Sequence, residues 1–448
     1  MYKLIIFTIV AVLSFEYLVY EGLLPPLFSY VPEILAMVVA VLVIVAGVRS
    51  RFQFVRPVYW LAFGALALVA LCGAIANQME PGPVFAGMRQ YLRALPFFFL
   101  PAVLEIKERQ LRVQLLLLLA FGLLQLPIAG MQRMATFAAG GTSGDDTFGT
   151  LMDSATLTLF LVAAVCVLTG FFLQKRISAK RFFPLIFLLL VPTMVNETKA
   201  VIVLVPIALM TCFVIGAKPG ARLKNTLIAL VTAACFVAVF IPAYDHFMKP
   251  RWGYGIVDFI AMEGRLEGYL DRGSEIGEYE QRAGKLGGLR VALSEVSRDP
   301  INLVFGLGIG NVSDSALGQQ FTGRYYDVYR VFLTSSGIYI IFEFGLAGLA
   351  LVLLLYWLLF KDSVSVAHRD ESIMGALATG WAGVLAVILI GIFYDNIIDS
   401  RALSVLFWYF SGLIAAYRMR LVSGAFDAST DSVVSSQFPS AHRGDTAP

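Results

Sequence analysis

Long apolar segments alternate with short polar segments along this 448-residue chain. Runs of about 17 to 25 apolar residues are long enough to cross the hydrocarbon core of a bilayer as helices, and a helix satisfies its own backbone hydrogen bonds there. The pattern predicts about twelve such spans: Leu4 to Tyr20, Ile34 to Val48, Val58 to Ile75, Val84 to Leu104, Leu111 to Met131, Leu151 to Leu173, Phe182 to Val195, Ala200 to Ile215, Leu227 to Ala243, Val331 to Phe360, Ile373 to Tyr394 and Ala402 to Tyr417. We expect an all-α, polytopic membrane helix bundle.

Polar interruptions of different lengths divide the chain. The seventh and eighth predicted spans are short and are separated only by Asn196-Glu197-Thr198, which leaves a re-entrant pair open as an alternative to two crossings. The longest interruption is rich in glycine and charge, and we expect it to fold as a mainly helical subdomain. The expected organisation is residues 1–242 as the first part of the bundle, 243–330 as the loop subdomain, 331–420 as the second part and 421–448 as a disordered cytoplasmic tail rich in Ser, Ala, Thr and Asp.

The distribution of Lys and Arg predicts the orientation of the bundle. Every second short connection is basic: Arg49, Arg51 and Arg56; Lys107, Arg109 and Arg112; Lys175, Arg176, Lys180 and Arg181; Lys218, Arg222 and Lys224; Lys361 and Arg369; Arg418 and Arg420. Basic connections lie on the cytoplasmic side. Both termini are then inside, and the 243–330 loop is outside, together with the loops near Gly22, Met79, Gly141, Glu197 and Asn396.

Composition supports a membrane protein and excludes other classes. Hydrophobic residues make up 58% of the chain and charged residues 15%, whereas soluble proteins carry about 25% charged residues. The net charge of +3 gives no reason to expect a nucleic-acid partner. The four cysteines lie in apolar spans without metal-binding spacing, so we expect them to pack as small apolar residues, with no metal site.

Cations at the outer ends of predicted spans are the first candidates for a binding site, because charge near hydrocarbon is costly unless it faces a cavity. Arg89 and Arg93 lie one helical turn apart, so both side chains share one face and together match a diphosphate. Snorkelling to the headgroups is the alternative. Lys199 begins the eighth span, where a cation opposes the helix dipole. This mismatch favours a functional role, and pairing with Glu197 is the alternative.

The outer loop carries arginines interspersed with acidic residues: Arg265, Arg272, Arg282, Arg290 and Arg298. Surface ion pairs account for most of such residues. Arg282 differs because it opens a stretch whose apolar residues recur at three- and four-residue spacing up to Val296, as in an amphipathic helix.

Three glycines at alternate positions follow this helix: Gly306, Gly308 and Gly310. They superficially match a dinucleotide-binding loop, but they lack the βαβ context that such a loop needs. We interpret them as a turn whose backbone approaches another segment closely.

Several short motifs follow one another along the chain. They are Phe148-Gly149-Thr150, Glu197-Thr198-Lys199-Ala200, a stretch at residues 300–311 that fits P-x(3-4)-F-G-x-G-x-G-N, and F-E-F-G-L-A-G at residues 342–348. In this order they resemble the O-antigen ligase and polymerase superfamily of bacterial envelopes. The first motif is similar to the family's outer T-F-G-T segment, and the second stands where the family often has S-R-G or S-K-G. The resemblance covers most of the chain as topology but only about 70 residues as pattern.

The resemblance implies a membrane-embedded glycosyltransferase of the bacterial inner membrane. Such enzymes move an oligosaccharide from undecaprenyl diphosphate to an acceptor sugar hydroxyl, without metal, cofactor or nucleotide sugar. By matching position, Arg282 and Lys199 would hold the donor diphosphate, since fixed cations stabilise a leaving anion. The implied partners are the lipid-linked oligosaccharide, the growing polysaccharide chain, membrane lipids and a chain-length regulator. The expected substrate-binding residues are Arg89, Arg93, Arg265, Arg290 and His246, the last being the only histidine on the predicted outer side.

One departure from the family pattern bears on the reaction. Family ligases tend to carry a histidine before the E-x-G-L-x-G segment, but residues 330–337 contain none. The general base is therefore open, and the missing histidine favours a polymerase over a ligase. Glu343 is the catalytic candidate, since a carboxylate within a span is costly unless it is used or paired. Its alternative role is as a structural partner of an arginine.

The main rival function is a lipid-linked oligosaccharide flippase or another transporter. Such carriers also have about twelve spans, and cationic sites suit an anionic substrate. They usually show matching halves and short loops. Here the first six spans contain no counterpart of the 243–330 loop, and no internal repeat is visible.

The orientation is tested by placing a single cysteine in the outer loop. In a background without native cysteines, Gly277→Cys should react with an impermeant maleimide in intact spheroplasts. Labelling that requires lysis would overturn the orientation and the mechanism that depends on it.

Overall fold

The computed structural model describes residues 2–50, 52–141, 144, 146–217, 220, 222–262, 264–271, 275–276, 280–281 and 283–423. In this part of the chain the fold is helical, apart from a hairpin of two short antiparallel strands. The elements are α1 (Tyr2–Tyr20), η1 (Pro26–Tyr30), α2 (Val31–Ser50), α3 (Pro57–Ala76), α4 (Pro81–Leu92), α5 (Pro96–Val103), α6 (Glu108–Ala138), α7 (Ser154–Leu173), α8 (Ala179–Val195), α9 (Val201–Ile215), α10 (Arg222–Trp252), α11 (Ile256–Ala261), α12 (Arg265–Asp271), β1 (Glu275–Ile276), β2 (Glu280–Gln281), α13 (Lys285–Val296), α14 (Pro300–Phe305), η2 (Gln319–Phe321), α15 (Tyr326–Tyr329), α16 (Ser336–Arg369), α17 (Ile373–Tyr394) and α18 (Arg401–Val422).

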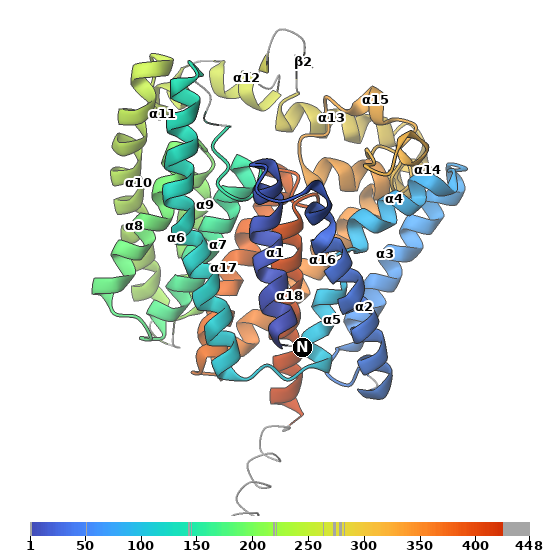
Figure 1. Ribbon diagram of the computed structural model, residues 1–448, viewed down its shortest axis with the longest axis horizontal. Helices are drawn as coiled ribbons and strands as arrows, with labels where there is room; N and C mark the ends of the chain where they lie inside the picture. Colours follow the sequence, from blue (N-terminus) through green and yellow to red (C-terminus); the bar gives the residue numbers. More distant parts are fainter. Residues whose placement is uncertain are drawn as a thin grey trace, which may run out of the picture.

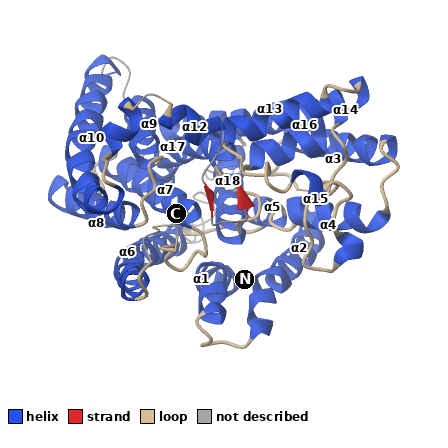
Figure 2. Ribbon diagram, turned by 90° about the horizontal axis from the view of Figure 1, so that it is seen from above, coloured by secondary structure: helices blue, strands red, loops and turns tan. Residues whose placement is uncertain are grey.

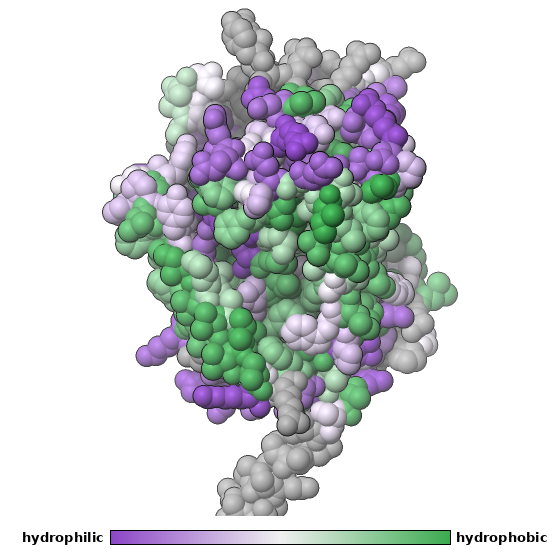
Figure 3. Space-filling view, turned by 90° about the vertical axis from the view of Figure 1, so that its right-hand side faces the viewer, coloured by the Kyte–Doolittle hydropathy of each residue, from purple (hydrophilic) through white to green (hydrophobic). Residues whose placement is uncertain are grey.

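Within the described residues, nine helical segments are long and apolar enough to cross a membrane. They are α1, the η1–α2 segment Pro26–Ser50, α3, α6, α7, the part of α10 from Leu223 to His246, α16, α17 and α18. Figure 3 shows apolar residues gathered in the middle of the molecule and polar residues towards its two ends. The expectation of a multi-pass membrane helix bundle is therefore confirmed.

The expected number of twelve spans is not confirmed, because three of the predicted spans are broken or short. The fourth is divided into α4 and α5, and Pro96 begins the second piece. Proline lacks an N–H and clashes with the preceding turn, so it favours a break at this point. The seventh and eighth correspond to α8 and α9, which have 17 and 15 residues.

Helices α7, α17 and α18 form the centre of the bundle. Figure 2 shows α18 surrounded by the other helices when the molecule is seen from above. α17 packs against both α7 and α16, and its side chains are among the most deeply buried of the spans. α7 and α17 approach each other closely at Gly170 and Gly380. A Cβ atom added at Gly170 would lie 2.5 Å or less from backbone atoms of α17.

A polar cluster joins three helices at the end of the bundle that holds the N-terminus. The side chain of Asp362 on α16 is only 1% exposed. It pairs with Arg56, which precedes α3, and with Arg418 on α18, and the Tyr59 hydroxyl donates to it at 2.8 Å. Charges buried at this depth are stable only when they are paired. The cluster therefore fixes α3, α16 and α18 relative to one another.

The loop subdomain covers the opposite end of the bundle (Figure 1). α10 continues to Trp252, beyond the predicted boundary at residue 243. α13 begins at Lys285 and packs on α16 through Ala292 and Val296, both fully buried. Leu286 and Leu293, although they share the predicted apolar spacing, are 45% and 38% exposed. The tail from residue 424 onward lies outside the described residues.

Removal of the Asp362 charge should destabilise the bundle. Asp362→Asn leaves two arginines without their counter-ion, and because each arginine is about one quarter exposed we expect a loss of about 1–3 kcal/mol in unfolding free energy. The matched control is Glu108→Gln, which breaks an exposed pair with Arg112 and should cost less than about 0.5 kcal/mol. Unfolding in mixed micelles measures both. Equal losses in the two variants would contradict the role of the cluster.

Candidate active site

A polar cavity of about 660 Å³ opens at the end of the bundle that carries the loop subdomain. Its walls come from the start of α7, the α17–α18 connection, the start of α13 and the segment between α15 and α16. Ligand cavities commonly have volumes of about 300–1,000 Å³, so this one is large enough for several sugar rings. Its charged lining residues are Glu16, Asp153, Lys285, Arg330, Asp395, Asp399 and Arg401.

The Phe148-Gly149-Thr150 motif positions the start of α7 at this cavity. Two glutamines of α6 hold it: the Gln132 side chain accepts from the N–H of Gly149 at 2.7 Å, and Gln125 accepts from the N–H of Thr150 at 2.8 Å. Gly149 has a φ of +61°, which favours glycine. Asp153 then caps α7, and its carboxylate accepts from the N–H of Thr156 at 2.6 Å. The motif thus fixes one carboxylate at the wall of the cavity.

The α17–α18 connection supplies the facing wall. Ser336 at the start of α16 holds it, since its N–H donates to the Asp395 carbonyl at 3.0 Å and its hydroxyl accepts from the N–H of Ile398 at 3.1 Å. Partial burial raises the pKa of the Asp395 carboxyl to about 7, and the Asp153 carboxylate acts in the same direction. Lys285 opposes the rise in the pKa of Asp395. Two carboxyl groups from distant segments therefore face each other in the cavity.

Two cations complete this part of the lining. The Lys285 ammonium donates to the Thr334 carbonyl at 2.6 Å and lies 5.6 Å from the centre of the Tyr394 ring. Arg401 begins α18, donates to the Ser29 carbonyl at 2.9 Å and lies 3.5 Å from a carboxylate oxygen of Glu33. The cavity thus presents both acidic groups and donors for an anion.

Arg89 and Arg93, predicted to bind a diphosphate together, lie on the far side of this wall. Arg89 pairs with Glu33. Arg93 donates to the Ile398 carbonyl at 3.1 Å and to the Asp399 carbonyl at 2.6 Å. Arg93 therefore supports the α17–α18 connection from behind, and neither arginine is part of the cavity lining.

Lys199 lies under the loop subdomain. Its ammonium is 5.2 Å from the centre of the Phe259 ring and 5.8 Å from that of Tyr269, a residue that lines the cavity. Glu197, the alternative partner considered for Lys199, pairs with Arg133, and both of those side chains are 9% exposed. The structure thus places Lys199 next to the cavity, behind one of its aromatic residues.

The other predicted cations differ in position. Arg290 is exposed and pairs with Asp271 at 2.7 Å, as expected of a surface arginine. Arg265 begins α12, and His246 is exposed near the end of α10. Arg282 lies outside the described residues, whereas the two residues that follow it, Ala283 and Gly284, line the cavity.

Glu343 is fully buried and is not part of the cavity lining. Its carboxylate accepts from the Ser313 hydroxyl at 2.7 Å, and the backbone N–H groups of Gly310 and Val312 lie near it. The glycine turn is thereby held against α16. The turn also packs on α4, where a Cβ atom at Gly310 would lie 2.0 Å from the Pro83 carbonyl oxygen. This confirms the interpretation of the glycines as a close backbone approach.

Sequence reasoning missed Asp153, Lys285, Asp395 and Arg401. Asp395 was visible as the first polar residue after an apolar span, and Asp153 as the residue next to the T-F-G-T-like motif. Neither signal indicates that the two carboxyl groups lie close together in the fold, because they belong to segments far apart in the sequence. No model of a known protein family matches the chain, and no curated protein matches it.

Substitution of the glycine turn should disturb the loop subdomain. Gly310 has a φ of +81°, so Gly310→Ala combines an unfavourable backbone conformation with the contact at Pro83, at a cost of about 1–3 kcal/mol or more. In contrast, Gly64→Ala on α3 places a methyl group where nothing lies within 4 Å and should be neutral or stabilising. Thermal unfolding and limited proteolysis of residues 306–330 measure the difference. Similar protease resistance in the two variants would exclude a close-packed turn.

Proposed function

We propose that this protein is a polysaccharide polymerase that joins undecaprenyl-diphosphate-linked repeat units on the periplasmic face of the bacterial inner membrane. In this proposal α4–α5, α8 and α9 complete twelve crossings, and the loop subdomain lies in the periplasm. The observation that carries the proposal is that the polar cavity and an apolar groove lie along the same two helices, α7 and α18.

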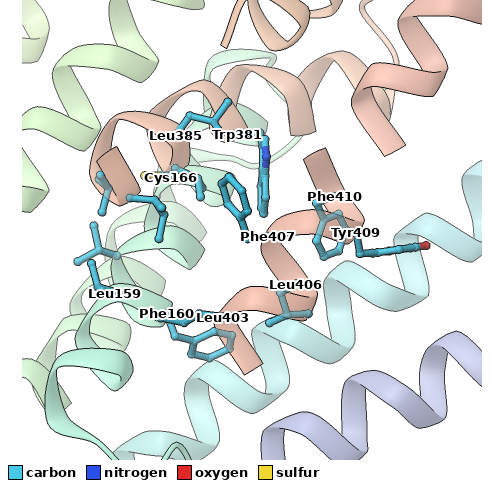
Figure 4. Close-up of a cluster of buried hydrophobic side chains, with 14 of the residues drawn as sticks. Leu159, Phe160, Cys166, Trp381, Leu385, Leu403, Leu406, Phe407, Tyr409 and Phe410 are labelled. Carbon is cyan, nitrogen blue, oxygen red and sulfur yellow. The ribbon is translucent and has the colours of Figure 1, made fainter. Parts of the chain in front are cut away.

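The groove lies between α6, α7, α17 and α18 and has a volume of about 160 Å³. Leu116 on α6 and Ala164 on α7 are among its partly exposed lining residues. Figure 4 shows Trp381, Phe407 and Phe410 close together on the α17–α18 side, and Phe160 beside Leu403. Apart from Arg112 near the start of α6, the lining is apolar, and within a membrane it is compatible with a hydrocarbon chain.

The groove and the cavity share two helices. On α7, Thr156 lines the cavity and Phe160, one turn further, lines the groove. On α18, Ala402 lines the cavity and Leu403 lines the groove. A lipid-linked oligosaccharide has the same order of parts, with a polar glycan, an anionic diphosphate and an apolar prenyl chain. A water-soluble sugar substrate would use the cavity alone.

The cations near the cavity support a reaction in which a diphosphate leaves. Lys285 and Arg401 are in the lining, and Lys199 stands behind Tyr269. Cationic donors fixed around a site stabilise negative charge as it develops on the leaving oxygen. In this proposal Arg93 orients the α17–α18 connection, and Glu343 holds the glycine turn.

The two alternative functions, ligase and flippase, would use the cavity and the groove differently. A ligase would transfer the completed chain to another acceptor, and the absence of histidine from residues 330–337 favours the polymerase. A flippase needs a polar path across the bilayer. The lining of the polar cavity instead comes from one end of the bundle, and its continuation along α7 and α18 is apolar.

The proposal is tested with purified protein and lipid-linked repeat units of two prenyl lengths. Wild-type protein should join units on the full-length prenyl carrier and should use a short, water-soluble carrier at least about 10-fold less well, since each buried CH₂ contributes about 0.8 kcal/mol. Ala164→Trp fills the groove and should reduce this preference.

The matched control is Ala67→Trp, which adds the same bulk at an exposed position on α3 away from both sites. It should retain the preference for the long carrier. Movement of the carrier across proteoliposomes without joining of units would support the flippase, and equal use of the two carriers would remove the groove from the proposal.

A further inference from the structure

Asp153 and Asp395 line the same cavity, and the Asp153 carboxylate is close enough to act on the Asp395 carboxyl. We propose that Asp395 is the catalytic residue that accepts the proton of the acceptor sugar hydroxyl, and that Asp153 is its positioning residue. This inference rests on the proposed function and assigns the general base that the sequence leaves open.

The geometry favours Asp395 over Glu343 for this role. Asp395 lines a cavity large enough for sugar rings, whereas Glu343 has no exposed surface and bonds to Ser313 and the glycine turn. A general base must come within hydrogen-bonding distance of the hydroxyl that it deprotonates. Asp395 lies in the lining, where a sugar hydroxyl bound in the cavity can reach it without rearrangement of the loop subdomain.

The two carboxyl groups are held by independent contacts. Asp153 is fixed by the N–H of Thr156 at the start of α7. The Asp395 backbone is fixed by Ser336, and α17 ends immediately before it. Because the anchors belong to the membrane helices α7 and α16, both residues are fixed in the wall of the cavity, where an acceptor hydroxyl can bind.

The proposed step transfers the glycan of one lipid-linked donor to the acceptor hydroxyl. The acceptor hydroxyl oxygen forms a bond to the anomeric carbon of the donor, while the bond from that carbon to the phosphate oxygen breaks. The bonding electron pair leaves with the diphosphate, which remains on the prenyl carrier. The hydroxyl proton passes to the Asp395 carboxylate, and Asp395 later releases it to water in the open cavity.

The protonation state of the Asp395 carboxyl makes the proposed reaction sensitive to pH. Asp153 and Lys285 act on it most closely. The other titratable or charged groups of the lining are Glu16, Tyr269, Tyr326, Arg330, Tyr339, Tyr394, Asp399 and Arg401. Since the pKa of Asp395 is raised to about 7, the base is protonated below that pH and ionised above it. Turnover should therefore fall as the pH decreases through about 7.

The test compares Asp395→Asn with Asp153→Asn in purified protein supplied with full-length lipid-linked donor. Asp395→Asn should reduce kcat about 100-fold or more, the usual contribution of a general base, and should bind the donor within about threefold of wild type. Asp153→Asn keeps a capping oxygen but removes a negative neighbour, so it should retain much of the maximal rate and shift the acidic limb of the pH profile to lower pH.

The matched control is Asp327→Asn on α15, an exposed aspartate outside the cavity lining, which should change neither kcat nor the pH profile. An infrared titration of the carboxyl bands gives a readout independent of turnover. The wild-type spectrum should contain a carboxyl that titrates near neutral pH, and Asp395→Asn should lack it.

The outcomes separate the two proposals. If wild-type protein joins repeat units and Asp395→Asn keeps its rate and its acidic limb, the assignment of Asp395 is wrong and the polymerase proposal stands. If Glu343→Gln loses turnover while Asp395→Asn does not, the base is Glu343. If wild-type protein joins no units under conditions in which it binds the lipid-linked donor, the polymerase proposal fails and the assignment fails with it.

Discussion

The high free-energy cost of unpaired polar groups in hydrocarbon is the constraint on which this structure depends. It requires helical backbone in the spans, and it drives charge towards the two ends of the bundle or into paired clusters. Asp362 with its two arginines is such a cluster, and so is the Arg133–Glu197 pair. A polar cavity of the size found beneath the loop subdomain is tolerated because it lies at an end of the bundle, where water reaches it.

The same constraint explains which segments of the chain supply the apolar groove and which supply the charged groups of the candidate site. Residues on helices form the groove and anchor the walls, while connections between helices supply most of the charged groups. The α17–α18 connection is held from behind by Arg93, which takes no part in the lining. Loss of such a support would change the shape of the site without removing a group from it.

The sequence predicts the helical class, most spans, the glycine turn and the amphipathic α13, because each depends on local periodicity or local backbone conformation. It does not predict the break at Pro96 within an apolar run, since hydropathy alone does not register a missing N–H. It places Arg89 and Arg93 on one face but not against Glu33 and the Asp399 carbonyl, and it does not bring Asp153 to Asp395. Those relations depend on how distant helices pack.

The cap on α7 has an effect beyond the helix that it begins. The carboxylate that accepts from the N–H of Thr156 also contributes, after burial, to the raised pKa of Asp395. One side chain therefore serves both the start of α7 and the electrostatics of the cavity. A substitution at position 153 changes the helix start and the charge of the cavity together.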